Sequence, residues 1–125
     1  MPRPVHFDIH ADDPERAAAF YGKVFGWQFQ HIAEMDYWLA ITGEDGPGIN
    51  GGIARRNGPA LRGDDAVTGA ILTMEVEDID AAIVAIEAEG AAVQMEKSDV
   101  PGIGLMAYYK DTEGNLFGII QPPAS

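Results

Sequence analysis

Three side chains that could do chemistry alternate near the start of the chain: His6, Asp8 and His10. Alternate residues of an extended strand share one face and lie roughly 6.6–6.8 Å apart along it. A carboxylate can orient an imidazole for proton transfer, so His6 and Asp8 are candidate catalytic residues of the acid–base type. The same spacing is also compatible with half of a metal site, or with a histidine that only hydrogen-bonds within a pocket.

Further candidate ligand contacts come from segments expected to share a face with these residues. Thr73 and Glu75 alternate within one strand-like run, although Glu75 is also expected to be exposed at the strand's end. Asn50 lies among glycines, which permit close approach of a ligand to the backbone or a bulge. Each aromatic residue either packs in the core or stacks on a planar ligand. The predicted ligand-binding set is His6, Asp8, His10, Trp38, Asn50, Thr73, Glu75 and Tyr108.

Composition excludes several classes of function. Eight Lys and Arg against twenty Asp and Glu give a net charge of −12, which argues against nucleic acid and against an anionic membrane surface as partners. The chain has no cysteine, so disulfides, a thiol nucleophile and cysteine-ligated metal centres are excluded. A reducing cytoplasm is the simplest compartment for such a chain, and no signal peptide is recognisable. The basic cluster Arg55, Arg56 and Arg62 is expected to be solvated linker, or to attract an anionic ligand.

The elements that must position these side chains follow from periodicity and capping signals. Apolar and polar residues alternate over 5–10, which predicts a strand with Phe7 and Ile9 on the face opposite His6. Asp13 and Pro14 suit the start of a helix, and Gly26 suits its end. Further strands are predicted over 27–32, 37–42 and 49–55.

The same order of elements then repeats. A strand over 70–76 precedes a helix that opens at Asp78 and closes at Gly90, and strands follow over 92–96, 105–109 and 116–121. The predicted fold class is α+β, with two tandem βαβββ modules forming one curved, mostly antiparallel sheet and the helices outside. Module boundaries are expected at about 4–57 and 68–122 within one domain spanning 1–125, joined by a polar linker over 58–67.

This duplicated arrangement resembles the vicinal oxygen chelate superfamily, which includes glyoxalase I, bleomycin-resistance and fosfomycin-resistance proteins and extradiol dioxygenases. The resemblance rests on the run from His6 to Ile9, on the run from Asp13 to Trp27 that contains Phe-Tyr-Gly-Lys-Val-Phe-Gly-Trp, and on Val76 to Ala82. It also rests on the Asp-Thr-Glu-Gly-Asn turn at 111–115. These motifs cover nearly the whole chain in order, and they specify structure more than chemistry.

The resemblance implies four metal-ligand positions, of which this chain matches one. His6 falls on the first position, the second falls within 49–52 on a glycine, the third falls at Ile71 and the fourth at Gly118. Isoleucine and glycine side chains cannot coordinate a divalent ion. We therefore expect no metal and no other cofactor, and the resemblance gives little support to glyoxalase I, fosfomycin-transferase or extradiol dioxygenase activity.

The resemblance implies a protein that binds a small, aromatic molecule in a concave sheet pocket without a divalent metal, as bleomycin-resistance proteins bind their drug without chemistry. The alternative is a lyase or isomerase that uses His6 as acid or base, or a nonstandard metal site built on His6, Asp8 and His10. A homodimer is also expected from the resemblance.

Overall fold

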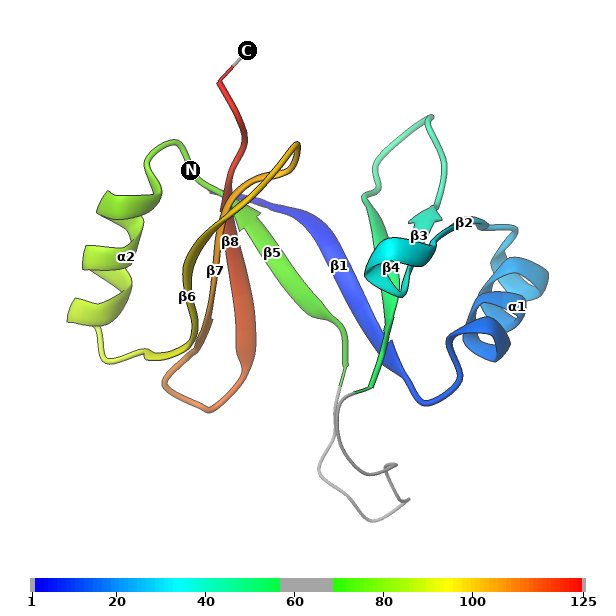
Figure 1. Cartoon of the computed structure of the whole chain (residues 1–125), viewed down its shortest axis with the longest axis horizontal. Coiled ribbons are helices and arrows are strands. Elements are labelled where there is room, and N and C mark those ends of the chain that lie inside the picture. The colour runs from blue at the N-terminus through cyan, green and yellow to red at the C-terminus, as the bar shows by residue number, and fades with distance from the viewer. Residues whose placement is uncertain (1, 57–68, 125) are drawn as a thin grey trace. The chain divides into compact units, whose positions relative to one another are not determined.

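The computed structural model describes residues 2–56 and 69–124 and contains the order βαβββ twice. Module 1 consists of β1 (Pro4–Ala11), α1 (Pro14–Phe25), β2 (Gln28–Ile32), the short 3₁₀ turn η1 (Ala33–Met35), β3 (Tyr37–Ile41) and β4 (Asn50–Arg55). Module 2 consists of β5 (Ile71–Glu75), α2 (Ile79–Ala88), β6 (Ala92–Val100), β7 (Gly104–Lys110) and β8 (Leu116–Gln121). The predicted α+β class and the repeated βαβββ order are confirmed (Figure 1).

Each module forms a four-stranded sheet with the same pairing rules. In module 1 the strand order is β2-β3-β4-β1, with β1 parallel to β4 and the other two pairs antiparallel. In module 2 the order is β6-β7-β8-β5, with β5 parallel to β8 and the other pairs antiparallel. One helix packs on one face of each sheet, and the opposite face is called the open face below.

Helix ends agree with the capping signals in the sequence. The Asp13 carboxylate accepts a hydrogen bond from the Arg16 N–H at 3.1 Å, and Pro14 is the first helical residue of α1. Gly26 ends α1 in the left-handed conformation, with φ of 77°. In α2 the Asp78 carboxylate accepts from the backbone N–H groups of Asp80 and Ala81. These caps satisfy backbone donors that a helix leaves unpaired at its start.

The core of module 1 lies between α1 and its sheet. Ala11, Trp38 and Ile53 are buried there, with Ile9, Ala17, Ala18, Tyr21 and Phe29 packed against them. Phe20 and Val24, which also recur at helical spacing, are instead 56% and 55% exposed. The buried face of α1 is therefore formed by its small residues and Tyr21.

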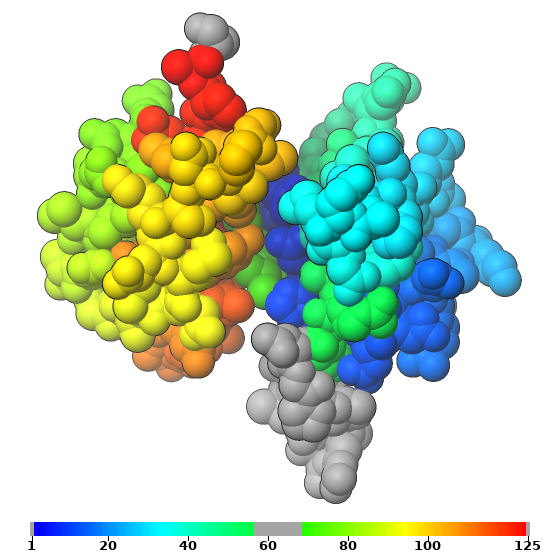
Figure 2. All heavy atoms as spheres, viewed as in Figure 1, coloured from blue at the N-terminus to red at the C-terminus, as the bar shows by residue number. Residues whose placement is uncertain are grey.

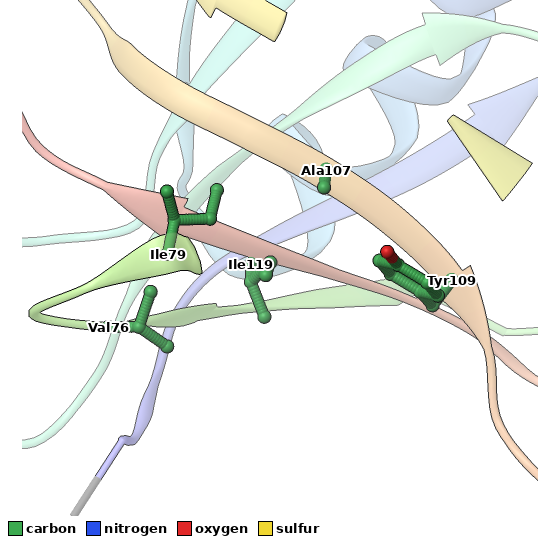
Figure 3. Close-up of a cluster of buried hydrophobic side chains, with 5 residues drawn as sticks. All are labelled: Val76, Ile79, Ala107, Tyr109 and Ile119. Carbon is green, nitrogen blue, oxygen red and sulfur yellow. The ribbon is translucent and has the colours of Figure 1, made fainter. Parts of the chain in front are cut away.

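The core of module 2 is built in the same way from Val76, Ile79, Ala107, Tyr109 and Ile119 (Figure 3). Strand β6 lies at the edge of this sheet, and eight of its nine residues are exposed (yellow to gold in Figure 2). It runs to Val100, beyond the predicted end at residue 96, with two register irregularities against β7. Such irregularities discourage pairing of an edge strand with another chain.

The Asp-Thr-Glu-Gly-Asn motif forms the turn between β7 and β8. The Asp111 carboxylate accepts hydrogen bonds from the N–H groups of Glu113 at 2.8 Å and Asn115 at 2.9 Å. These bonds hold the pKa of Asp111 below its ordinary value. The motif is thus explained by local turn chemistry.

The predicted linker over 58–67, with Arg62, lies outside the described residues. The described chain divides into two compact units, His6–Ala70 and Met1–Val5 with Ile71–Ser125. None of the helices in the described ranges is both long and apolar enough to cross a membrane.

Tyr109 gives module 2 a testable dependence on alkaline pH. Its hydroxyl donates to the Glu87 carboxylate at 2.6 Å, and burial, followed by that bond, raises its pKa from 10.0 to about 12. A folded-state pKa above the unfolded value stabilises the fold below pH 10, and that contribution is lost as pH rises from 10 to about 12. The loss has a slope of at most about 1.4 kcal/mol per pH unit.

We expect Tyr109→Phe to lose less unfolding free energy than the wild type over this pH interval, because phenylalanine cannot ionise. Denaturant titrations at several pH values measure this difference. Equal pH slopes in the two proteins would contradict the assignment.

Candidate functional site

Three polar side chains meet on the open face of module 1. His6 Nε2 lies 2.8 Å from the Tyr37 hydroxyl, and that hydroxyl donates to Asp8 Oδ1 at 2.5 Å. His6 Nε2 also lies 3.4 Å from Asp8 Oδ1. The Asp8 side chain is 12% exposed and the His6 side chain 32% exposed, so His6 is the more accessible member. We call these three residues the polar cluster.

The hydrogen bonds of the polar cluster determine which group is the donor and which is the acceptor in each bond. A phenol has one proton, and here it points to a carboxylate, which only accepts. The Tyr37 oxygen must then accept from His6, so the network assigns a proton to His6 Nε2. In the neutral tautomer the other ring nitrogen, Nδ1, is then a hydrogen-bond acceptor.

Strand register brings the polar cluster together. Strand β1 supplies His6 and Asp8, which stand opposite Asn50 and Gly52 of the parallel strand β4. Strand β3 supplies Tyr37, which stands opposite Ala54 of β4. Asp8 thus lies beside a residue without a side chain, and the phenol of Tyr37 occupies the space above it.

The close approach of the Tyr37 phenol to β4 requires a glycine at position 52. A Cβ built on Gly52 would collide with the hydroxyl and the ring carbon Cζ of Tyr37. The glycine-rich segment Gly51-Gly52 therefore admits a phenol over the sheet at Gly52.

The structure places the other predicted site residues of module 1 elsewhere. Trp38 is on the helix side, 6% exposed and stacked on His31 with ring centroids 4.2 Å apart, so it does not share the face of the polar cluster. Asn50 closes its own loop, because its Oδ1 accepts from the Thr42 N–H at 2.9 Å. His10 is exposed, and its carbonyl accepts from Arg56 at 2.8 Å.

The basic cluster is not solvated linker where the structure describes it. Arg55 is the last residue of β4 and pairs with Asp36 at 2.9 Å. Arg56 donates its backbone N–H to the Ala11 carbonyl at 2.7 Å and lies 3.6 Å from Asp12. Both arginines therefore fix the end of β4.

Module 2 repeats the arrangement with different chemistry. Thr73 stands opposite Gly118, as Asp8 stands opposite Gly52. A Cβ on Gly118 would approach the Tyr108 ring to 2.7 Å and the Thr73 hydroxyl to 2.9 Å. Thr73 is 1% exposed, and its hydroxyl has no hydrogen-bond partner among the described residues. Glu75 is exposed at the end of β5, in agreement with one of its two predicted placements.

The side chains present do not fit a divalent metal. His6 Nε2 is occupied by the Tyr37 hydroxyl, and Gly52 and Gly118 are buried positions closed by tyrosine rings. Among residues 2–56 and 69–124, no group of three or more His, Cys, Asp or Glu is arranged to hold an ion. An ion at His6 Nε2 would have to displace the Tyr37 hydroxyl from that nitrogen.

The two βαβββ modules place the chain in the class of duplicated α+β folds with a helix on one side of each sheet. Its sequence matches the model of the Glyoxalase/Bleomycin resistance protein/Dioxygenase superfamily over residues 3–119, and the chain belongs to that superfamily.

Relatives agree with this assignment. A glyoxylase-like domain-containing protein from Didymella fabae is 31% identical, over 93% of this chain and 91% of its own. A solved superfamily member from Vibrio splendidus 12B01 is 14% identical with a TM-score of 0.67, covering 97% of this chain and 99% of its own. Methylmalonyl-CoA epimerase from Mycobacterium tuberculosis is 16% identical with a TM-score of 0.63, covering 97% and 88%. The two structures show a shared fold.

Tyr37 is the member of the polar cluster that sequence reasoning did not select. Tyr37 is one of several aromatic residues whose face depends on pairing with other strands, which alternation within its own run does not determine. Its signal in the sequence is the combination of a tyrosine at the start of a strand with a glycine pair in the next strand.

Gly52→Ala tests the fit of the phenol. The added methyl collides with Tyr37, so we expect a loss of about 1–3 kcal/mol in unfolding free energy. Gly48→Ala is the control, because a Cβ there meets nothing within 4 Å. In a Tyr37→Ala background the Gly52→Ala cost should largely vanish, and an undiminished cost would refute the contact.

Thr73→Val tests the buried Thr73 hydroxyl. Valine keeps the shape and removes a polar group that has no partner within 2–56 and 69–124, so unfolding free energy should rise by about 1 kcal/mol. Thr42→Val is the matched control, because the Thr42 hydroxyl donates to the Ile49 carbonyl at 2.7 Å and its loss should destabilise. Destabilisation by Thr73→Val would show that the hydroxyl has a partner in solution.

Proposed function

We propose that this protein binds a small, partly aromatic molecule on the open face of module 1 without a divalent metal, and that the polar cluster anchors it. The observation that carries this proposal is the hydrogen-bonded contact of Tyr37 with both His6 and Asp8. Small-molecule sites combine apolar surface with a few fixed polar groups that set orientation. The cluster supplies such groups, already held in place.

The accessible part of the anchor is the His6 ring. Asp8 is mostly buried beneath its partners, whereas about a third of the His6 side chain is exposed. A ligand therefore meets the imidazole first, with Nδ1 accepting a hydrogen bond from it in the neutral tautomer. Tyr37 and Asp8 hold the ring from the other side and fix its orientation.

A second candidate function is a lyase or isomerase in which His6 transfers a proton. The observation that favours it is the donor order, in which the His6 ring donates to the Tyr37 oxygen and the phenol donates to Asp8. If Nδ1 takes a proton from a substrate, Tyr37 and Asp8 stabilise the imidazolium that forms. This is the arrangement expected of a general base with an orienting partner.

The test of the proposed function is thermal unfolding of tag-free, EDTA-treated protein. One series adds Ni²⁺, Zn²⁺, Mn²⁺, Fe²⁺ or Mg²⁺, and a second adds phenols, benzoic acids or aryl amines. A probe at a hundred times its dissociation constant adds ~2.7 kcal/mol, which raises the midpoint by several degrees. We expect a rise with an aromatic probe that is weakened in His6→Ala and Tyr37→Phe.

His31→Ala is the matched control, because His31 lies on Trp38, away from the polar cluster. A rise with a metal that disappears in His6→Ala but persists in His31→Ala would contradict metal-free binding. Proton transfer is tested separately with methylmalonyl-CoA in D₂O, since structural relatives carry that epimerase name. Loss of its α-proton signal with wild type but not with His6→Gln would favour the second candidate.

The homodimer and the cytoplasmic location stay predictions. Sedimentation of the untagged chain at micromolar concentration measures the first of these.

A further inference from the structure

Among the residues that the structure describes, Asp36 is the only one other than glycine with a positive φ, and it directly precedes Tyr37. Asp36 has φ of 48° and ψ of 53°, and its N–H bonds to the Ala33 carbonyl at 3.2 Å. It ends η1 and turns the chain into β3, whose first residue is Tyr37. Left-handed backbone is uncommon for residues other than glycine, although aspartate tolerates it better than most. The direction in which Tyr37 leaves the turn depends on this conformation.

Arg55 contacts both chain neighbours of Tyr37. Its guanidinium donates from Nε to Asp36 Oδ2 at 2.9 Å and from Nη2 to Oδ1 at 3.4 Å. The same group lies 6.0 Å from the centroid of the Trp38 ring. A planar guanidinium that makes two parallel bonds to a carboxylate fixes orientation as well as distance.

We infer that Asp36 and Arg55 are positioning residues for Tyr37, which place its hydroxyl where it reaches His6 and Asp8 together. The inference rests on the proposed function in so far as that function gives the polar cluster its role. Neither residue belongs to the cluster itself. They act through the backbone of β3.

The exposure of the Asp36–Arg55 ion pair indicates that it contributes more to the placement of Tyr37 than to the stability of the fold. The side chains of Arg55 and Asp36 are 52% and 53% exposed, and pairs so exposed contribute little to folding. The hydrogen bond that they orient is sensitive, because O–H···O bonds span only ~2.5–3.0 Å. A shift of about 1 Å in the Tyr37 hydroxyl would end its bond to Asp8.

The module 2 pair Lys97–Asp80 provides a matched control. Its Nζ–Oδ1 distance is 2.7 Å, and its side chains are 41% and 72% exposed. Lys97→Gln therefore removes a similarly exposed ion pair that has no connection with Tyr37.

The experiment uses the full chain labelled with ¹³C at Cζ of tyrosine, whose chemical shift reports the hydrogen bonding of the phenol. The chain has four tyrosines, so the spectrum has four signals, and Tyr37→Phe assigns the relevant one. We expect Arg55→Gln and Asp36→Asn each to move the Tyr37 signal as far as Asp8→Asn does. Lys97→Gln should leave it in place.

The Tyr21 signal serves as an internal measure of the folded state of module 1, because that residue packs against its core. Asp36→Asn keeps a side chain that tolerates left-handed backbone, so it tests the ion pair if Arg55→Gln fails to fold. An unmoved Tyr37 signal in either folded variant would overturn the inference. Because no ligand is present, this result is independent of whether the aromatic probes bind.

Discussion

The arrangement of module 1 depends on one close approach, that of the Tyr37 phenol to the backbone at Gly52. The parallel register of β1 and β4 puts Asp8 beside Gly52, and the antiparallel register of β3 and β4 brings Tyr37 over it. A side chain at position 52 would exclude the phenol. Without the phenol, Asp8 would be a largely buried carboxylate lacking the hydrogen bond that offsets its desolvation.

The repeat shows which part of this arrangement belongs to the fold and which to the site. Both modules place a tyrosine ring over a buried glycine that stands opposite the first strand. In module 1 the partner on that strand is Asp8, which is hydrogen-bonded, whereas in module 2 it is Thr73, whose hydroxyl has no partner in the part of the chain that the structure describes. The ring–glycine packing is therefore common to the two halves, and the bonded polar chemistry is specific to module 1.

Local sequence signals are sufficient to predict the helices and strands. They are not sufficient to predict which strands pair and in which register. Asp13, Gly26 and Asp78 mark helix ends through bonds to residues within four positions, so the sequence predicts them. Alternation likewise placed His6 and Asp8 on one face. The faces of Tyr37 and Trp38 depend on how β3 pairs with β4 and on where α1 packs, and no window of residues around them contains that information. The polar neighbours of Arg55 predict a solvated linker, because its partner Asp36 lies 19 residues away in the sequence.

The polar cluster shows how an imidazole and a carboxylate on one strand can be linked through a third residue. A metal ion balances several such donors through its charge. Here one phenol links the two side chains, accepting from the imidazole and donating to the carboxylate. In each module a buried glycine leaves room for a tyrosine ring. Under the proposed function, the imidazole held by Tyr37 and Asp8 is the fixed polar group that orients a bound molecule.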